Sequence, residues 1–193
     1  MRILGIDPGT RMAGYGIIEI QNSGKILAVA AGAWDLNANQ ELASRLATLA
    51  IEFRRVVAAY APTHLCIELS FLAENPRSAL YLGHARGVVL SEAHQSGLKI
   101  SEISATSAKK IISGNGRCNK NEIAKIMSSL LGFQMQSLPL DATDALSIAC
   151  ADAMRIKQSS FHSSSIIDKS DSNKKILEEW SKSKKQKRRL QFF

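Results

Sequence analysis

The chain has 193 residues, of which 45% are hydrophobic, and a formal net charge of +8 at pH 7; this length predicts one domain, or one domain with an appendage. Its three cysteines, Cys66, Cys118 and Cys150, are far apart and form no C-x-x-C pair, which argues against a disulfide framework or a zinc site and favours a reducing compartment. Asp7 interrupts the short apolar run at the N-terminus, and no other apolar run is long enough to cross a bilayer, so we expect a soluble, cytoplasmic protein with no signal peptide and no membrane contact.

Most of the positive charge lies at the C-terminal end of the chain. Residues 155–193 contain 11 Lys or Arg and 4 Asp or Glu, whereas residues 1–154 contain 14 and 13. The net charge therefore says little about whether the folded part binds nucleic acid. The stretch from residue 158 onward is rich in serine and ends in a basic block. We expect a folded domain over residues 1–157 and a flexible tail over residues 158–193 that attracts DNA without sequence preference.

The first elements are three short β-type runs at residues 2–7, 15–20 and 26–33, and the turn residues between them predict an antiparallel meander. An amphipathic helix over residues 40–60 follows, and Pro62 ends it. The rest of the pattern predicts, in chain order, a strand at 64–69, a helix at 76–95, a strand at 99–103, and helices at 107–112, 120–131 and 140–156. A meander followed by alternating helices and strands predicts an α/β fold with a mixed sheet flanked by helices.

The first strand runs into Asp7-Pro8-Gly9, and this tripeptide has two interpretations. Asp, Pro and Gly favour successive positions of a β-turn, so the first interpretation is that Asp7 only shapes the reversal. The second is that Pro8 and Gly9 make the turn and leave the carboxylate of Asp7 at a strand end, where it can hold a metal ion. The octapeptide of residues 3–10 does not decide between them.

Three further acids are unusual in their positions. Glu68 interrupts an apolar strand near its end, while Asp141 and Asp144 share one face at the start of the last helix. An ion pair would explain Glu68, and the helix macrodipole would explain Asp141. If these acids meet Asp7, their repulsion requires a cation, and sparse hard oxygen ligands suit Mg²⁺ or Mn²⁺. Two such ions about 4 Å apart support phosphodiester cleavage.

Four motifs in a fixed order resemble those of the RuvC family of Holliday-junction resolvases, and the resemblance covers about residues 1–155. The motifs are GIDPGT with the following GYG (5–10, 14–16), IE with the following FL and N (67–68, 71–72, 75), SALYLGHARG (78–87) and DATDAL (141–146). One motif alone would not be specific. The resemblance implies an RNase H-like α/β fold, with a mixed five-stranded sheet that is antiparallel in its first three strands and flanked by helices.

The resemblance also implies an activity. Members of the family are homodimeric, structure-selective endodeoxyribonucleases that resolve four-way DNA junctions by paired symmetric nicks, in homologous recombination and DNA repair. The implied catalytic and metal-binding residues are Asp7, Glu68, Asp141 and Asp144. They would hold Mg²⁺, with Mn²⁺ as a substitute and two ions per active site. The implied protein partner, besides a second copy of the chain, is the RuvA–RuvB branch-migration complex.

By the same resemblance, three residues contact DNA: Phe71, Lys109 and Lys120. The lysines would contact phosphate and stabilise the charge that develops at the scissile group, and Phe71 would stack on unpaired bases at the junction centre. Simpler interpretations stay open. For Lys109, whose neighbour Lys110 makes the match ambiguous, the alternative is a solvated helix residue. For Phe71 it is a hydrophobic staple against the next helix.

Ala79, Gly83 and Gly87 recur at four-residue spacing in the helix predicted over residues 76–95. Such a row permits close approach of another helix. It offers either a homodimer surface, which would match the two-fold symmetry of a junction, or a surface that packs on the chain's own sheet.

Three other functions fit parts of the sequence. An actin-like or sugar-kinase ATPase also has a strand–Asp–Gly–Thr phosphate loop, but 193 residues leave no room for its second lobe. Another RNase H-like nuclease, acting on RNA or simple duplexes, would use the same acids. A non-catalytic DNA-binding module is disfavoured, because a binding surface gains nothing from clustered anions that face phosphate.

Overall fold

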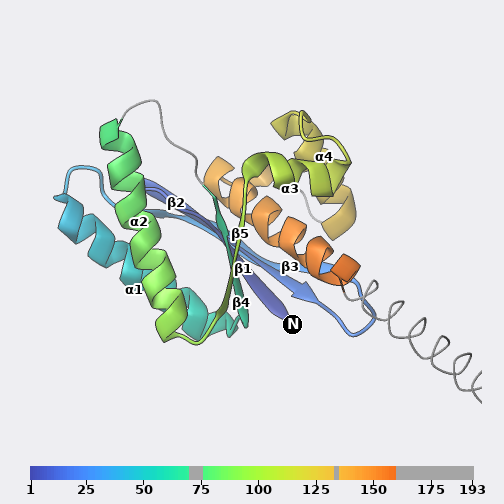
Figure 1. The fold of residues 1–193 in the computed structure, drawn as a ribbon, viewed down its shortest axis with the longest axis horizontal. Coiled ribbons are helices and arrows are strands. Elements are labelled where there is room, and N and C mark those ends of the chain that lie inside the picture. The colour runs from blue at the N-terminus through green and yellow to red at the C-terminus, as the bar shows by residue number, and fades with distance from the viewer. Residues whose placement is uncertain (70–75, 133–134, 160–193) are drawn as a thin grey trace, which may run out of the picture. The chain divides into compact units, whose positions relative to one another are not determined.

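The computed structural model describes residues 1–69, 76–132 and 135–159, and its centre is a five-stranded mixed sheet (Figure 1). The order across the sheet is β3-β2-β1-β4-β5. The first three strands form the predicted antiparallel meander, and the last two run parallel to β1; they are β1 (Arg2–Asp7), β2 (Met12–Ile20), β3 (Ile26–Asp35), β4 (His64–Glu68) and β5 (Lys99–Ile103). The predicted RNase H-like fold class is confirmed.

Helices cover both faces of this sheet (Figure 1). α1 (Leu42–Tyr60) and α2 (Pro76–Gln95) pack against each other over one face. The helix of residues 140–159 lies over the other face, together with α3 (Ala105–Ser113), α4 (Lys120–Leu131) and the short 3-10 turn η1 (Met135–Ser137).

Side-chain alternation along β1 decides what each face carries. Leu4 and Ile6 are fully buried and belong to the apolar core beneath α1 and α2. Gly5 points the other way, against the backbone of the helix of residues 140–159. Asp7, two residues further, lies on the face of Gly5 and not on the face of the core.

The same alternation governs β4. Leu65 and Ile67 are fully buried in the core under α1 and α2. Cys66 points to the opposite face. Burial raises the pKa of its thiol, and the charge of Asp152, a buried residue of the last helix, raises it further. Glu68 therefore lies on the same face of the sheet as Asp7.

Several element boundaries differ from those expected. β2 begins at Met12 and β3 ends at Asp35, because the pairing of the two strands continues past the residues with high β propensity until Met12 lies opposite Asp35. α1 begins two residues later than expected. α3 begins two residues earlier, because the side chain of Ser104 accepts a hydrogen bond from the amide of Ser107 and caps the helix.

Three glycines allow the last helix to contact the sheet backbone directly. A Cβ atom on Gly5 would overlap the carbonyl oxygen of Ala145, and one on Gly14 would overlap that of Asp141. A Cβ atom on Gly16 would lie 2.7 Å from the Cα atom of Leu146, closer than real contacts allow. The helix thus sits on β1 and β2 at a distance that no larger side chain permits.

The contacts divide the chain into two compact units, Met1–Arg155 and Ile156–Phe193. Only residues 156–159 of the second unit are described, so the flexible tail expected at residues 158–193 lies almost wholly outside the described residues and stays a prediction. Among the helices of the described residues, none has the length and apolar character that a bilayer crossing needs.

We predict that Gly5→Ala destabilises the protein by about 1–3 kcal/mol, because the added methyl group forces the last helix away from the sheet. Urea unfolding of the full-length chain measures the loss. Ser44→Ala, at an exposed position of α1, is the control and should change the free energy of unfolding by no more than about 0.5 kcal/mol. Equal losses in both variants would contradict the proposed role of the close contact.

Candidate active site

The structure brings the four predicted acids to one region of the molecule. Asp7 and Glu68 end two neighbouring parallel strands, which pair with Ile6 opposite Ile67. Asp141 and Asp144 lie in the first turn and a half of the last helix. In the sheet Asp7 lies opposite Gly14, and Gly14 contacts the backbone of Asp141. The close helix–sheet contact therefore places the helical acids beside the strand-end acids.

The electrostatic state of Asp7 reflects this crowding. Its pKa is raised from the ordinary value of 3.8 to about 7, first because the carboxyl group is buried and then because Glu68 and Asp144 lie close by. A hydrogen bond with the side chain of Glu68 and the charge of Asp141 raise it further. The carboxyl group of Asp7 is therefore harder to ionise than that of an isolated aspartate.

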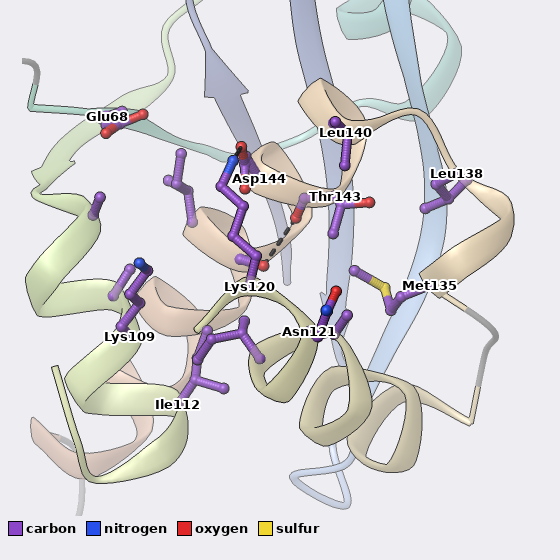
Figure 2. A pocket seen from close by; sticks show the side chains of 16 residues that line it. Glu68, Lys109, Ile112, Lys120, Asn121, Met135, Leu138, Leu140, Thr143 and Asp144 are labelled. Atoms are coloured by element: carbon purple, nitrogen blue, oxygen red, sulfur yellow. Dashed lines mark hydrogen bonds and ion pairs between the residues drawn. The ribbon is translucent and has the colours of Figure 1, made fainter. Parts of the chain in front are cut away.

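A lysine provides a positive charge within the cluster. The Nζ atom of Lys120 lies 2.7 Å from Oδ2 of Asp144 (Figure 2), and this bond raises the pKa of Lys120. Lys120 is the first residue of α4, and a capping box fixes the start of that helix: Asn119 accepts from the amide of Glu122, whose side chain accepts from the amide of Asn119. The capping box therefore fixes where the backbone of Lys120 lies, at the start of α4.

A pocket of about 550 Å³ lies beside these groups (Figure 2). Its charged lining comes from Glu68, Asp144, Lys109 of α3 and Lys120 of α4. Most of the remaining lining is apolar and is contributed by α3, α4, η1 and the last helix. The pocket is therefore lined by carboxylates and ammonium groups together with mostly apolar side chains.

The acids fit a hard cation by donor type, but they do not form a complete preformed site. Carboxylate oxygens at sparse spacing are ligands that Mg²⁺ and Mn²⁺ prefer. Within residues 1–69, 76–132 and 135–159, however, no three His, Cys, Asp or Glu side chains lie close enough together to hold a metal ion. The raised pKa of Asp7 nevertheless requires the other acids to be close. Both observations follow if the carboxylates share a region, while repulsion and the Lys120 ion pair keep their oxygen atoms from converging on one point.

The predicted DNA-contacting residues have different outcomes. Lys109 and Lys120 both line the pocket that Glu68 and Asp144 also line, so neither lysine is a remote surface residue. Phe71 lies outside the described residues, and its stacking role stays a prediction.

The row of small residues on α2 faces away from the sheet at two of its three positions. Among the described residues, a Cβ atom on Gly83 or on Gly87 would meet nothing within 4 Å, and Leu80 on the same side is 59% exposed. The alternative that these two glycines pack on the chain's own sheet is therefore wrong.

Arg45 is a residue near the site that the sequence interpretation missed. It is buried in the apolar stripe of α1, one turn before Leu49, and its guanidinium donates at 2.8 Å to the carbonyl oxygen of Thr10. Its Nε atom has no partner among the described atoms. The loop after Asp7 is thus tied to α1. An arginine at an apolar position of the helical stripe was the signal that could have identified it.

The sheet order is that of an RNase H-like fold, and acids at the ends of β1 and β4 and at the start of the helix over them suit a nuclease of that class. Comparison with known proteins makes this specific. The family model for crossover junction endodeoxyribonuclease RuvC matches residues 3–152, and the chain belongs to that family.

Individual relatives agree with this assignment. The crossover junction endodeoxyribonuclease RuvC of Heliobacterium modesticaldum is 38% identical over 156 residues, which cover 80% of this chain and 96% of the relative. The structure of Thermus thermophilus RuvC superposes with a TM-score of 0.76 at 24% identity, over 82% of this chain and 97% of that one. The same protein in complex with a Holliday junction substrate gives 0.74 at 22% identity, over 82% and 96%. These two structures support the fold.

Family membership decides between the functions that the sequence left open. The chain is a metal-dependent endonuclease, a hydrolase that resolves Holliday junctions, as its family does. An ATPase, a nuclease of simple duplexes and a non-catalytic binding module are therefore not favoured.

The raised pKa of Asp7 predicts how the stability of the metal-free protein depends on pH. Between about pH 4 and pH 7 the folded state binds more protons at Asp7 than the unfolded state, so the free energy of unfolding should fall as the pH rises through this range. Asp7→Asn should remove this slope and stabilise the protein at pH 8 by about 1–3 kcal/mol. Urea unfolding in EDTA at pH 5 and pH 8 measures both effects. Identical pH slopes for the two proteins would show that the carboxyl group of Asp7 is not perturbed by its neighbours.

Proposed function

We propose that this chain cuts four-way DNA junctions by paired symmetric nicks, with Asp7, Glu68, Asp141 and Asp144 as the residues that hold the divalent metal. The observation that carries the proposal is the proximity of these acids, which, together with burial of the carboxyl group, raises the pKa of Asp7 to about 7. Such an arrangement destabilises the protein unless a cation binds. Evolutionary relationship to crossover junction endodeoxyribonucleases supplies the reaction.

The proposed cation is Mg²⁺, with Mn²⁺ as a substitute and two ions per active site. All four side chains offer hard oxygen atoms, which both ions prefer. Bound divalent ions would activate water and stabilise the leaving oxygen atom of the phosphodiester. The chain's own contribution is to hold the four carboxylates in one region, at the ends of two strands and at the start of a helix, from which they would close on the ions.

Lys120 has two successive roles in this proposal. In the free protein its ammonium group neutralises Asp144 at 2.7 Å. Once the carboxylate of Asp144 binds a metal ion, the ammonium group is available to a phosphate oxygen of the DNA. Lys109 lines the same pocket and adds a second positive charge. Both lysines would attract the backbone and stabilise negative charge that develops during hydrolysis.

The proposed substrate is a four-way DNA junction and the proposed assembly is a homodimer, and the two-fold symmetry of the dimer would match that of the junction. Thermus thermophilus RuvC has been solved with a Holliday junction substrate, which supports the same DNA structure as the substrate of this chain. The exposed side of α2, with Gly83, Gly87 and Leu80, is the proposed contact with a second copy. A two-fold dimer presents two active sites to two equivalent strands, as paired nicks require.

Three further features stay predictions. They are the stacking of Phe71 on bases at the junction centre, the cooperation with the RuvA–RuvB complex and the cytoplasmic location. Residues 158–193 are proposed to attract DNA through their basic side chains.

The central test compares a synthetic four-way junction, a linear duplex of the same sequence and an RNA–DNA hybrid, each with Mg²⁺ and with EDTA. We expect symmetric nicks in the junction alone and only with Mg²⁺. Asp7→Asn should lower the single-turnover rate by about 10³-fold or more and leave junction binding intact. Equal cutting of the linear duplex, or an active Asp7→Asn variant, would contradict the proposal.

A second experiment separates the two roles of Lys120. Lys120→Met removes the ammonium group that competes for Asp144, so the Mg²⁺ concentration for half-maximal rate should fall by up to about 5-fold, the range of an exposed ion pair. The maximal rate should fall as well, because the phosphate contact is lost. Lys125→Met, on the exposed side of the same helix, is the control and should change neither quantity. A lower rate with an unchanged Mg²⁺ requirement would leave the phosphate role and eliminate the competition.

A further inference from the structure

Arg86 connects α2 to the end of the strand that carries Glu68. Its side chain is only 17% exposed. One terminal nitrogen of the guanidinium donates to the backbone carbonyl oxygen of Glu68, and the other lies 2.7 Å from Oε2 of Glu102 on β5. A single side chain from α2 thus holds the adjacent ends of β4 and β5.

The peptide group that joins Glu68 to Leu69 is hydrogen-bonded at both its amide and its carbonyl oxygen. The amide of Leu69 donates at 2.8 Å to the carbonyl oxygen of Ile103 on β5, and Arg86 takes the carbonyl oxygen of Glu68. These two bonds fix the peptide plane that follows Glu68, and the pairing of Ile67 and Glu68 with β5 holds the plane that precedes it. The two planes together set the direction of the Cα–Cβ bond of Glu68.

The guanidinium of Arg86 binds the backbone of Glu68, whereas its ion pair is with Glu102. Arginine ordinarily pairs with carboxylates, often through two parallel bonds. In this structure the carboxylate of Glu102 provides that partner, and no ion pair joins Arg86 to the carboxylate of Glu68 among the described residues. The register explains the separation: Glu102 lies opposite Ile67, whose side chain faces α1 and α2, so Glu102 faces α2 as well.

We propose that Arg86 is a positioning residue for the endonuclease reaction. It fixes the backbone of Glu68 so that the carboxylate faces the metal, and Glu102 keeps the guanidinium from neutralising that carboxylate. This inference rests on the proposed role of Glu68 as a metal ligand. It predicts that disturbing either partner weakens metal binding without weakening the binding of DNA.

The test measures the Mg²⁺ dependence of single-turnover junction cleavage by the full-length chain. Arg86→Met should raise the half-saturating Mg²⁺ concentration by about 10-fold, the effect typical of residues that orient metal ligands. Arg86→Lys should restore part of the loss, because one ammonium group reaches the carbonyl oxygen but lacks the fork that holds both partners. Junction affinity without Mg²⁺ should stay within about 2-fold of the parent protein.

Two further variants make the result decisive. Arg54→Met breaks a comparable arginine–glutamate pair, with Glu92, that joins α1 to α2 away from the acids; it should lower stability and leave the Mg²⁺ requirement unchanged. Glu102→Gln keeps the shape of its side chain but frees the guanidinium for Glu68, so it should raise the Mg²⁺ requirement. If Arg86→Met does not fold, Glu102→Gln decides the question.

The inference is overturned if folded Arg86→Met has the parent Mg²⁺ requirement, or if Arg54→Met shares its shift. Glu68→Gln separates this failure from failure of the proposed function. An active Glu68→Gln variant with a normal Mg²⁺ requirement would remove Glu68 from the metal site, and the role of Arg86 with it. An inactive Glu68→Gln variant beside an unaffected Arg86 series would overturn the positioning role alone.

Discussion

Repulsion between carboxylates is the interaction around which this molecule is built. Asp7, Glu68 and Asp144 lie close enough for Asp7 to retain a proton near neutral pH. What holds them together is the contact between the last helix and the sheet, where Gly5 and Gly14 carry no side chain that would separate the two backbones. The apolar core on the opposite face, beneath α1 and α2, provides the stability that this arrangement requires.

The positively charged side chains around the acids are of two kinds: a lysine that pairs with a carboxylate and arginines that bind backbone carbonyl oxygens. Lys120 neutralises Asp144 from within the pocket, through a partly exposed bond that another cation can replace. Arg86 and Arg45 act from the α1 and α2 side and bind backbone carbonyl oxygens, at Glu68 and Thr10. The arginines thereby stabilise the backbone next to two acids without neutralising their carboxylates. Rigid supports with an exchangeable counter-ion suit a site that binds metal reversibly.

Much of the fold could be predicted because it depends on local periodicity. Strand alternation and the amphipathic pattern of α1 are short-range features. Such features identified the strands and α-helices of the described residues in order, whereas the short 3-10 helix η1 was not predicted. Boundaries were less accurate where long-range pairing extends a strand, as at Met12 opposite Asp35. For Asp7, the chain reverses between β1 and β2 over residues 8–11, but Gly9 lacks the positive φ that the predicted β-turn requires. The carboxyl group lies close to Glu68 and Asp144, as the second interpretation expects.

The sequence by itself determined which acids end the strands and start the last helix, and the order of its motifs determined the family. Only the tertiary structure decided which groups neutralise one another. Lys120 and Asp144 are 24 residues apart and Arg86 and Glu68 are 18 apart, and no local period connects them. Such pairs depend on helix packing and strand register, which arise only when the whole sheet has formed. For the same reason, the sequence could not show whether Gly83 and Gly87 face the sheet or face away from it. Only the packing of α2 against the rest of the fold decided that they face away.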